Sequence, residues 1–259
     1  MKDLHIIVCL KSVVLEAPRG RIVRTAENSV MNPFDRPAVE IALALRNEVG
    51  GTVTAVSMGP PVAGNALLEA TAMGADRAVL LTDAAMAGAD TLATAAVLNA
   101  AISQLPPFDL LVFGTRTADS DTGQVGPQTA VSLGVPMITQ VSHMEPAGTG
   151  CRLERQCDGF TETYECAFPA AVSVNPDAVV PREIGLGDLE TAFGDKAYDV
   201  WGLEQIGLSP EATGESGSPT RVLTISPVKT RKACEFIEGD DAQKRDELIN
   251  HLSNAGLIG

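Results

Sequence analysis

Apolar residues along the first half of the chain fall into short runs separated by longer amphipathic stretches. The runs cover residues 4–10, 51–58, 77–81, 109–114 and 136–142, and they are mostly apolar without alternation. Continuous apolarity is typical of strands that are covered on both faces. Between them, helices are expected over residues 37–49, 62–73 and 91–105, with Asp35 as the N-cap of the first and Gly74 ending the second. This alternation predicts an α/β fold with a doubly wound parallel sheet.

The second half of the chain has a different pattern. Residues 151–156 and 160–166 alternate around Asp158 and Gly159, which predicts an antiparallel hairpin, and a strand follows at 170–174. Proline then interrupts the chain repeatedly, and only residues 241–252 again show a helical pattern. We therefore expect one α/β domain over residues 1–180, including a hairpin near 151–166, and a distinct segment over 181–259. That segment either packs back on the domain or embraces a partner chain.

Charge and cysteine usage narrow the classes of function. The 259 residues carry a net charge of -14, which disfavours nucleic acid or an anionic membrane as a partner. Five cysteines without a paired framework, and an N-terminus unlike a signal peptide, predict a cytoplasmic protein. No apolar stretch approaches twenty residues, so no membrane insertion is expected.

Residues 117–130, TADSDTGQVGPQTA, are the strongest candidate for a binding site. They follow an apolar strand, and Asp121 or Thr122 is expected to cap a helix that starts near Gly123. Gly123 and Gly126 would let backbone N–H groups approach a phosphate at the positive end of the helix. The alternative is a well-capped helix with a glycine-rich entry and no ligand.

Two further turns are expected at the same sheet edge, at residues 56–61 and 32–37. For residues 32–35 the alternative is an ordinary helix start. No histidine has a neighbouring Cys or carboxylate at ligand spacing, and neither a Walker loop nor a G-x-S-x-G motif occurs, so a metal centre and catalytic side chains are not expected.

Several motifs in this order resemble the beta subunit of electron transfer flavoproteins. They are NPFD at 32–35, MGADRAVLLTD at 73–83, GADTLATA at 88–95, ADSDTGQVGP at 118–127 and GLSPEATGESGSPTRV at 207–222. The likeness covers essentially the whole chain and is greatest to the branch with nitrogen-fixation-associated and electron-bifurcating members. It implies an adenine-nucleotide-binding (HUP-like) sheet and a heterodimer with an alpha subunit that carries FAD. It also implies AMP or a second FAD in the beta-subunit pocket, and a C-terminal arm over 181–259 that wraps the alpha subunit.

The resemblance implies which residues line that pocket. They are Cys9, Asn32, Pro33, Phe34, Asp35, Met58, Asp119, Asp121, Thr122, Gly123, Gln124, Val125, Gly126 and Thr129. Backbone amides and a Thr hydroxyl near residues 121–126 would hold the phosphates. Trp201, Leu203 and Leu208 would face water in the absence of the partner.

The family likeness also implies a flavin-containing dehydrogenase as electron donor. Relatives often carry a basic segment in the docking region, whereas residues 181–201 here are acidic, which predicts an unusual dehydrogenase partner. Two alternatives share the architecture: an ATP-hydrolysing protein of the PP-loop type and a universal-stress ATP binder. Both lack their signature, because residues 9–18 read CLKSVVLEAP and Gly126 is followed at the required spacing by Pro136 and Met137. An interaction module without ligand is a third, weaker possibility.

Overall fold

The computed structural model describes residues 3–15, 24–195, 197–224 and 234–258. The chain divides into two compact units, Met1–Val222 and Leu223–Gly259. The first unit contains β1 (Leu4–Leu10), β2 (Ser12–Val14), β3 (Ser29–Met31), α1 (Asp35–Val49), β4 (Gly51–Met58), α2 (Gly64–Met73), β5 (Arg77–Leu81), α3 (Thr91–Ile102), β6 (Leu110–Gly114), α4 (Val125–Leu133), β7 (Met137–Ala147), β8 (Gly150–Cys157), β9 (Phe160–Ala167), β10 (Ala170–Val174), α5 (Leu186–Asp195), β11 (Asp199–Trp201), α6 (Leu203–Ile206) and α7 (Gly214–Gly217). The second unit contains α8 (Asp241–Asn254).

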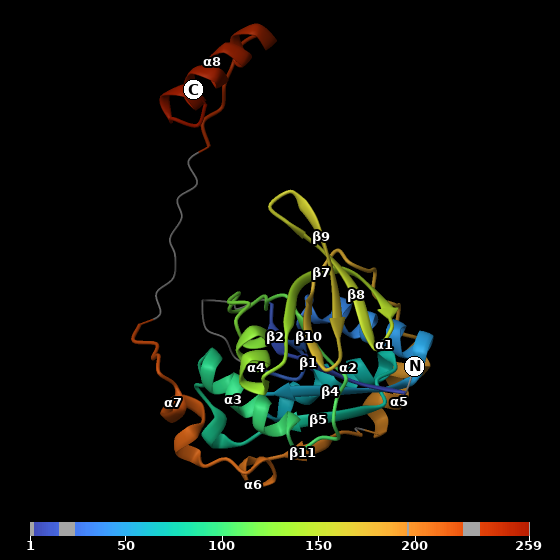
Figure 1. Cartoon of the computed structure of the whole chain (residues 1–259). Coiled ribbons are helices and arrows are strands. Elements are labelled where there is room, and N and C mark those ends of the chain that lie inside the picture. The colour runs from blue at the N-terminus through green and yellow to red at the C-terminus, as the bar shows by residue number, and fades with distance from the viewer. Residues whose placement is uncertain (1–2, 16–23, 196, 225–233, 259) are drawn as a thin grey trace. The chain divides into compact units, whose positions relative to one another are not determined.

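The main sheet has nine strands in the order β11-β5-β4-β1-β6-β10-β7-β8-β9 (Figure 1). Pairing is parallel from β11 to β7 and antiparallel from β7 to β9. The doubly wound parallel sheet with an antiparallel hairpin is therefore confirmed. Asp158 and Gly159, both at positive φ, form the hairpin turn.

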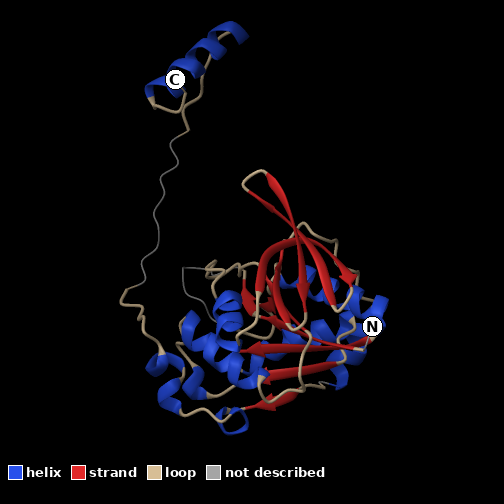
Figure 2. Ribbon diagram, in the orientation of Figure 1, coloured by secondary structure: helices blue, strands red, loops and turns tan. Residues whose placement is uncertain are grey.

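Side chains of β1 alternate between two apolar cores, one on each face of the sheet. Ile6 and Val8 pack with helices α1 and α2, whereas Ile7 packs with helices α3 and α4. Figure 2 shows these helices around the red strands. Because both faces are covered, the strand has no polar face, which explains why its sequence does not alternate.

Residues 186–195 and 197–222 differ from the sequence prediction. A helix, α5, forms at 186–195, and β11 extends the sheet beside β5. Leu203 is buried, and Trp201 and Leu208 pack against the core with α3 and α4, so the expectation that these three residues face water is wrong. Single-sequence periodicity missed the short elements because a three-residue strand such as β11 needs a neighbouring sheet edge to form.

The second unit consists of residues 223–259, and its described part is dominated by α8. Asp240 caps this helix by accepting a hydrogen bond from the Gln243 amide, which confirms the helix expected at 241–252. None of its residues is buried. None of the described helices is long and apolar enough to cross a bilayer.

Candidate functional site

The strand order reverses direction between β1 and β6. The chain moves from β1 to β4 and β5 on one side, and then returns to place β6 and β10 on the other. In open α/β sheets, ligands bind outside the carboxyl ends of the strands at such a reversal. The end of β1 at Leu10 and the end of β6 at Gly114 therefore define the candidate site.

Asn32 connects two of the turns that meet at this edge. Its side-chain amide donates to Asp35 Oδ1 and to the Arg116 carbonyl, both at 2.9 Å. Its Oδ1 accepts the Ala118 amide at 3.1 Å, and the residue has no exposed surface. All the hydrogen-bonding groups of this side chain are used, so Asn32 holds the loop after β6 in place rather than offering a group to a ligand.

Asp35 completes the same network but does not cap the helix as expected. Helix α1 begins at Asp35 itself, with Phe34 at the N-cap position and no side-chain cap. The carboxylate instead accepts the Lys11 amide at 2.7 Å and the Asn32 amide, because a buried carboxylate needs donors for both oxygens. Burial raises the pKa of Asp35 to about 7, although these hydrogen bonds act in the opposite direction. A Cβ on Gly114 would collide with this carboxylate and with the Phe34 carbonyl, so only glycine fits there.

Three cations that the sequence analysis did not select surround the loop. Lys11 Nζ lies 2.8 Å from Asp119 Oδ1, and Arg24 lies 3.9 Å from the other oxygen. The Arg116 guanidinium lies 4.7 Å from the centre of the Phe34 ring and 3.4 Å from Asp121. The available signal was position, since Lys11 follows β1 directly and Arg116 follows β6 by two residues.

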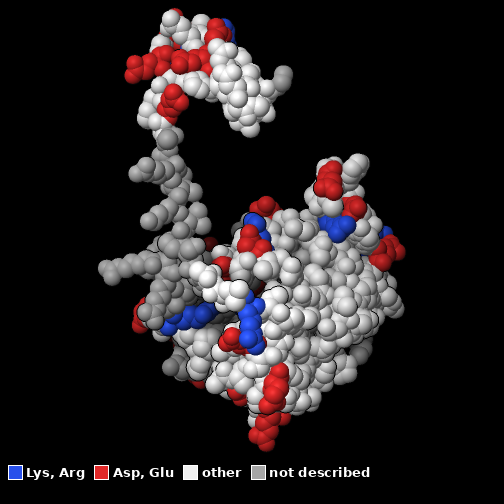
Figure 3. All heavy atoms as spheres, turned by 90° about the vertical axis from the view of Figure 1, so that its left-hand side faces the viewer, with Lys and Arg blue, Asp and Glu red and all other residues white. Residues whose placement is uncertain are grey.

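Charge at this edge is mixed rather than strongly positive. Partial burial disfavours the charged form of Asp119, but the hydrogen bond and charge of Lys11 outweigh it and lower its pKa. Figure 3 shows basic and acidic side chains lying next to each other on one face of the molecule. Lys11, Arg24 and Arg116 still outnumber the partly exposed carboxylates of Asp119 and Asp121, which suits an anionic group.

The start of helix α4 lies later than predicted. The helix begins at Val125 with Gln124 at the N-cap position and no side-chain cap, so capping by Asp121 or Thr122 is wrong. Left-handed backbone at Asp121 (φ 53°) and Gly123 (φ 63°) turns the chain before the helix starts, and Asp121 pairs with Arg116 instead.

Among the described residues, the backbone N–H groups of residues 122–126 have no hydrogen-bond partner. Residues 121–124 are exposed, Val125 is half-buried and Gly126 is buried, so the amides of residues 122–124 are the ones most open to an anion at the helix N-terminus.

The absence of a side chain at Gly126 serves the packing of α4 on the sheet. A Cβ there would lie 3.0 Å from Met137 Cε and 3.1 Å from the Phe113 ring, both in the sheet beneath the helix. Glycine thus allows α4 to sit close to β6. Thr129 is also buried and donates to the Val125 carbonyl at 2.8 Å.

The remaining expected site residues lie at the same edge with different exposure. Cys9 is buried, and burial together with the charge of Asp35 raises the pKa of its thiol far above the usual range, so it stays neutral. Met58 ends β4 and packs against the core, and Pro33 is exposed. Among the described residues, the Ser57 hydroxyl next to Met58 is buried without a hydrogen-bond partner. An unpaired buried hydroxyl is uncommon and indicates an unmet polar contact at this edge.

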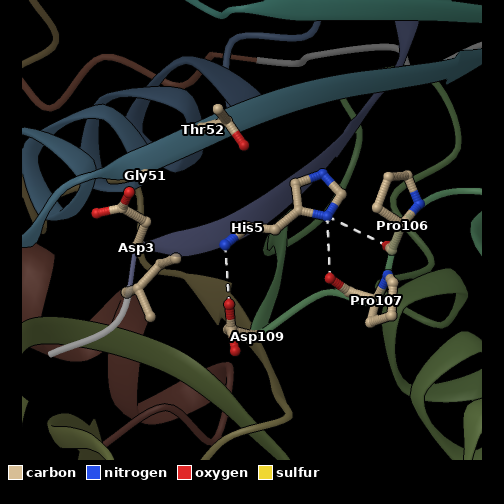
Figure 4. A pocket seen from close by; sticks show the side chains of 8 residues that line it. Asp3, His5, Gly51, Thr52, Pro106, Pro107 and Asp109 are labelled. Atoms are coloured by element: carbon tan, nitrogen blue, oxygen red, sulfur yellow. Dashed lines mark hydrogen bonds between the residues drawn. The ribbon is translucent and has the colours of Figure 1, made fainter.

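A cavity of about 360 Å³ lies at the opposite, amino edge of the sheet (Figure 4). His5, Asp3, Thr52 and Asp109 are among its lining residues. The His5 ring already contacts Thr54 Oγ1 at 2.9 Å and the carbonyls of the two prolines that precede β6, so it is a structural histidine. Neither this cavity nor a second one of about 170 Å³ includes an expected nucleotide-site residue. In the described part of the chain, no three His, Cys, Asp or Glu side chains are grouped to hold a metal ion.

The sheet order, its reversal at β1 and β6, and the unpaired amides before α4 define a doubly wound α/β protein with a ligand edge suited to an anion. A sequence model described as the electron transfer flavoprotein domain matches residues 20–192. The chain therefore belongs to the electron transfer flavoprotein family, which confirms the resemblance seen in its motifs.

Curated relatives match over nearly the full chain. An electron transfer flavoprotein subunit beta from Clostridium acetobutylicum is 38% identical, covering 98% of this chain and 100% of the relative. The caffeyl-CoA reductase-Etf complex subunit CarD from Acetobacterium woodii is 36% identical, with the same coverage. The protein FixA from Azotobacter vinelandii is 35% identical, covering 94% of this chain and 91% of the relative. These relatives do not favour the ATP-binding alternatives.

Proposed function

We propose that this chain acts as the beta subunit of a heterodimeric electron transfer flavoprotein and holds an adenine nucleotide at the carboxyl edge of its sheet. The observation that carries the proposal is the set of unpaired amides at residues 122–126, beside Lys11 and Arg116. A diphosphate or monophosphate satisfies such amides and gains from the helix dipole. The relatives support the subunit assignment by their names.

The protein residues divide into two roles in this proposal. Residues 122–126 bind phosphate oxygens through the backbone, and Thr122 adds a hydroxyl donor. Asn32 and Asp35 fix the loop after β6, so the amides point toward the ligand before it arrives. This preorganisation lowers the entropy lost on binding.

The bound nucleotide decides which chemistry the subunit supports. FAD at this edge would supply redox chemistry, accepting electrons from a nicotinamide and splitting them between two acceptors, whereas AMP would be structural. In either case the heterodimer carries electrons between a flavin dehydrogenase and an acceptor. Both possibilities use the same phosphate contacts, since AMP and FAD share the adenylate.

The first test is to identify the nucleotides in the heterodimer. We expect the chain co-purified with its alpha subunit, after heat release, to yield either two FAD per heterodimer or one FAD and one AMP. The first result assigns FAD to this subunit and the second assigns AMP. A heterodimer that releases a single FAD and no other adenine nucleotide would contradict the proposed site.

We propose further that the second unit binds the alpha subunit. Its helix α8 buries no residue, and Leu248 and Ile249 lie one after the other on it with 49% and 45% of their surfaces exposed. Burial of these side chains by a partner would stabilise the complex through the hydrophobic effect.

Helix α5 and the segment before it form the proposed docking surface for the dehydrogenase. Val180 and Leu186 are 89% and 80% exposed, and the nearby acidic residues Glu183, Asp188 and Glu190 are also exposed. The Arg182 guanidinium holds the segment in place with two hydrogen bonds to Glu40, at 2.7 and 2.9 Å. We infer a dehydrogenase partner with an apolar recess and a basic rim, because these would complement the surface.

We expect Leu186→Ala to slow electron transfer from a flavin dehydrogenase to the heterodimer by about tenfold, since an exposed anchor side chain is removed from the interface. The readout is the rate of flavin reduction in stopped flow. Val131→Ala is the matched control, because Val131 in α4 is also 80% exposed. Equal rates for the two variants would argue against docking at α5.

A further inference from the structure

Asp90 at the start of α3 makes two separate sets of hydrogen bonds. Its Oδ1 accepts the Ala93 amide at 2.9 Å and so caps the helix. Its Oδ2 accepts both the amide of Thr220, at 3.1 Å, and the hydroxyl of Thr220, at 2.8 Å. The Asp90 amide donates to Ser218 Oγ at 2.8 Å. We call the three bonds between Asp90 and residues 218–220 the latch.

The segment that the latch holds is closely packed against the loop before α3. Thr213 is fully buried, and the Glu215 amide donates to the Ala87 carbonyl at 2.9 Å. Gly214 has φ 56°, and a Cβ there would overlap the Ala85 carbonyl. Residues 213–220 are thus fitted to this loop, three residues before the second unit begins at Leu223.

The next residue along α3 reaches the candidate nucleotide site. Thr91 Oγ1 donates to Gln124 Oε1 at 3.2 Å, and Gln124 is the N-cap residue of α4. Helices α3 and α4 also pack against each other. A continuous chain of contacts therefore runs from Thr220 through Asp90 and Thr91 to the unpaired amides at residues 122–126.

We propose that Asp90 is a positioning residue that couples the packing of residues 213–220 against the loop before α3 to nucleotide binding at residues 122–126. This inference rests on the proposed function. A bound phosphate that orders the start of α4 also favours the latched segment. By linkage, a latched segment strengthens nucleotide binding by the same factor. The chain leading to the second unit is then held most firmly when the nucleotide is bound.

Asp90→Asn breaks the bonds to Thr220 while it keeps the helix cap. Asparagine is a good N-cap residue, so its Oδ1 can still accept the Ala93 amide, but its Nδ2 cannot accept the two donors of Thr220. Thr220→Val removes the hydroxyl donor alone. Thr91→Val cuts the link to Gln124 and leaves the latch intact. Asp240→Asn is the matched control, because Asp240 is also a helix N-cap, accepting the Gln243 amide at the start of α8, and makes none of the latch bonds.

The experiment measures amide hydrogen exchange of peptides covering residues 213–222 and 121–126 in the full-length chain, with and without AMP or FAD added separately. In the native chain, nucleotide is expected to slow exchange in both peptides. Asp90→Asn and Thr220→Val should speed exchange at 213–222, abolish its response to nucleotide and weaken nucleotide binding about fivefold. Thr91→Val should keep slow exchange at 213–222 but lose its nucleotide response.

Two results would overturn the coupling. One is nucleotide protection confined to residues 121–126 in the native chain. The other is unchanged nucleotide affinity in variants whose 213–222 peptide exchanges faster, which would leave the latch a purely structural contact. A native chain that binds neither AMP nor FAD is a different failure, since it contradicts the proposed function itself and the coupling with it.

Discussion

Asn32→Ala is expected to weaken AMP and FAD binding by at least about tenfold and to lower the free energy of unfolding by roughly 2–4 kcal/mol. The substitution leaves the buried Asp35 Oδ1, together with the part-buried Arg116 carbonyl and Ala118 amide, without the partner that Asn32 provides. Each group then lacks the hydrogen bond that offsets the free-energy cost of removing it from water. The loop after β6 also loses the contacts that fix its position, so nucleotide binding must order it.

Calorimetric titration with AMP and with FAD, together with urea unfolding, measures both effects. Asn65→Ala is the control, because Asn65 makes a single exposed hydrogen bond, to the Ala26 carbonyl at 3.0 Å. That variant should lose less than about 1 kcal/mol. A large loss of stability in Asn32→Ala with unchanged nucleotide affinity would show that the network supports the fold but not the site.

The stability of the protein is expected to fall as pH rises from about 4 to about 7 through the titration of Asp35. Its pKa is about 7 in the folded chain and 3.8 in its ordinary state, so the folded chain binds more protons than the unfolded chain over this window. The free energy of unfolding therefore decreases with rising pH, by about 4 kcal/mol at most. Below and above the window this contribution is constant.

Asp35→Asn should remove this dependence, because the amide does not ionise. The free energy of unfolding of the variant minus that of the native chain should therefore increase from pH 5 to pH 8, as measured by urea unfolding at each pH. Asp119→Asn is the opposite control, since Lys11 holds the pKa of Asp119 below its usual value. The stability that Asp119 contributes is lost only as pH falls through the acid range. A constant difference between native chain and Asp35→Asn from pH 5 to pH 8 would contradict a raised pKa for Asp35.

The helix caps predicted for α1 and α4 are both absent for the same physical reason. Asp35 was expected to cap α1, and Asp121 or Thr122 to cap α4, because the local sequence offers those side chains as acceptors. In the structure, the Asp35 carboxylate accepts the Lys11 amide, and Asp121 forms an ion pair with Arg116. Lys11 and Asp35 are 24 residues apart, so local pattern could not reveal their contact. Gly126 similarly meets Phe113 and Met137 only once α4 lies on the sheet.

The sequence by itself determined β1 and β4 to β10, helices α1, α2, α3 and α8, the hairpin turn at Asp158 and Gly159, and the family. Apolar periodicity and turn residues act over a few neighbouring positions and need no tertiary context. Only the tertiary structure decided that Asn32 and Asp35 fix the loop after β6, that residues 197–222 pack on the core, and that Asp90 holds Thr220. Those features depend on contacts between residues that are distant in the sequence. A polar group that becomes buried there must form a hydrogen bond, and only the folded chain decides which partner lies close enough.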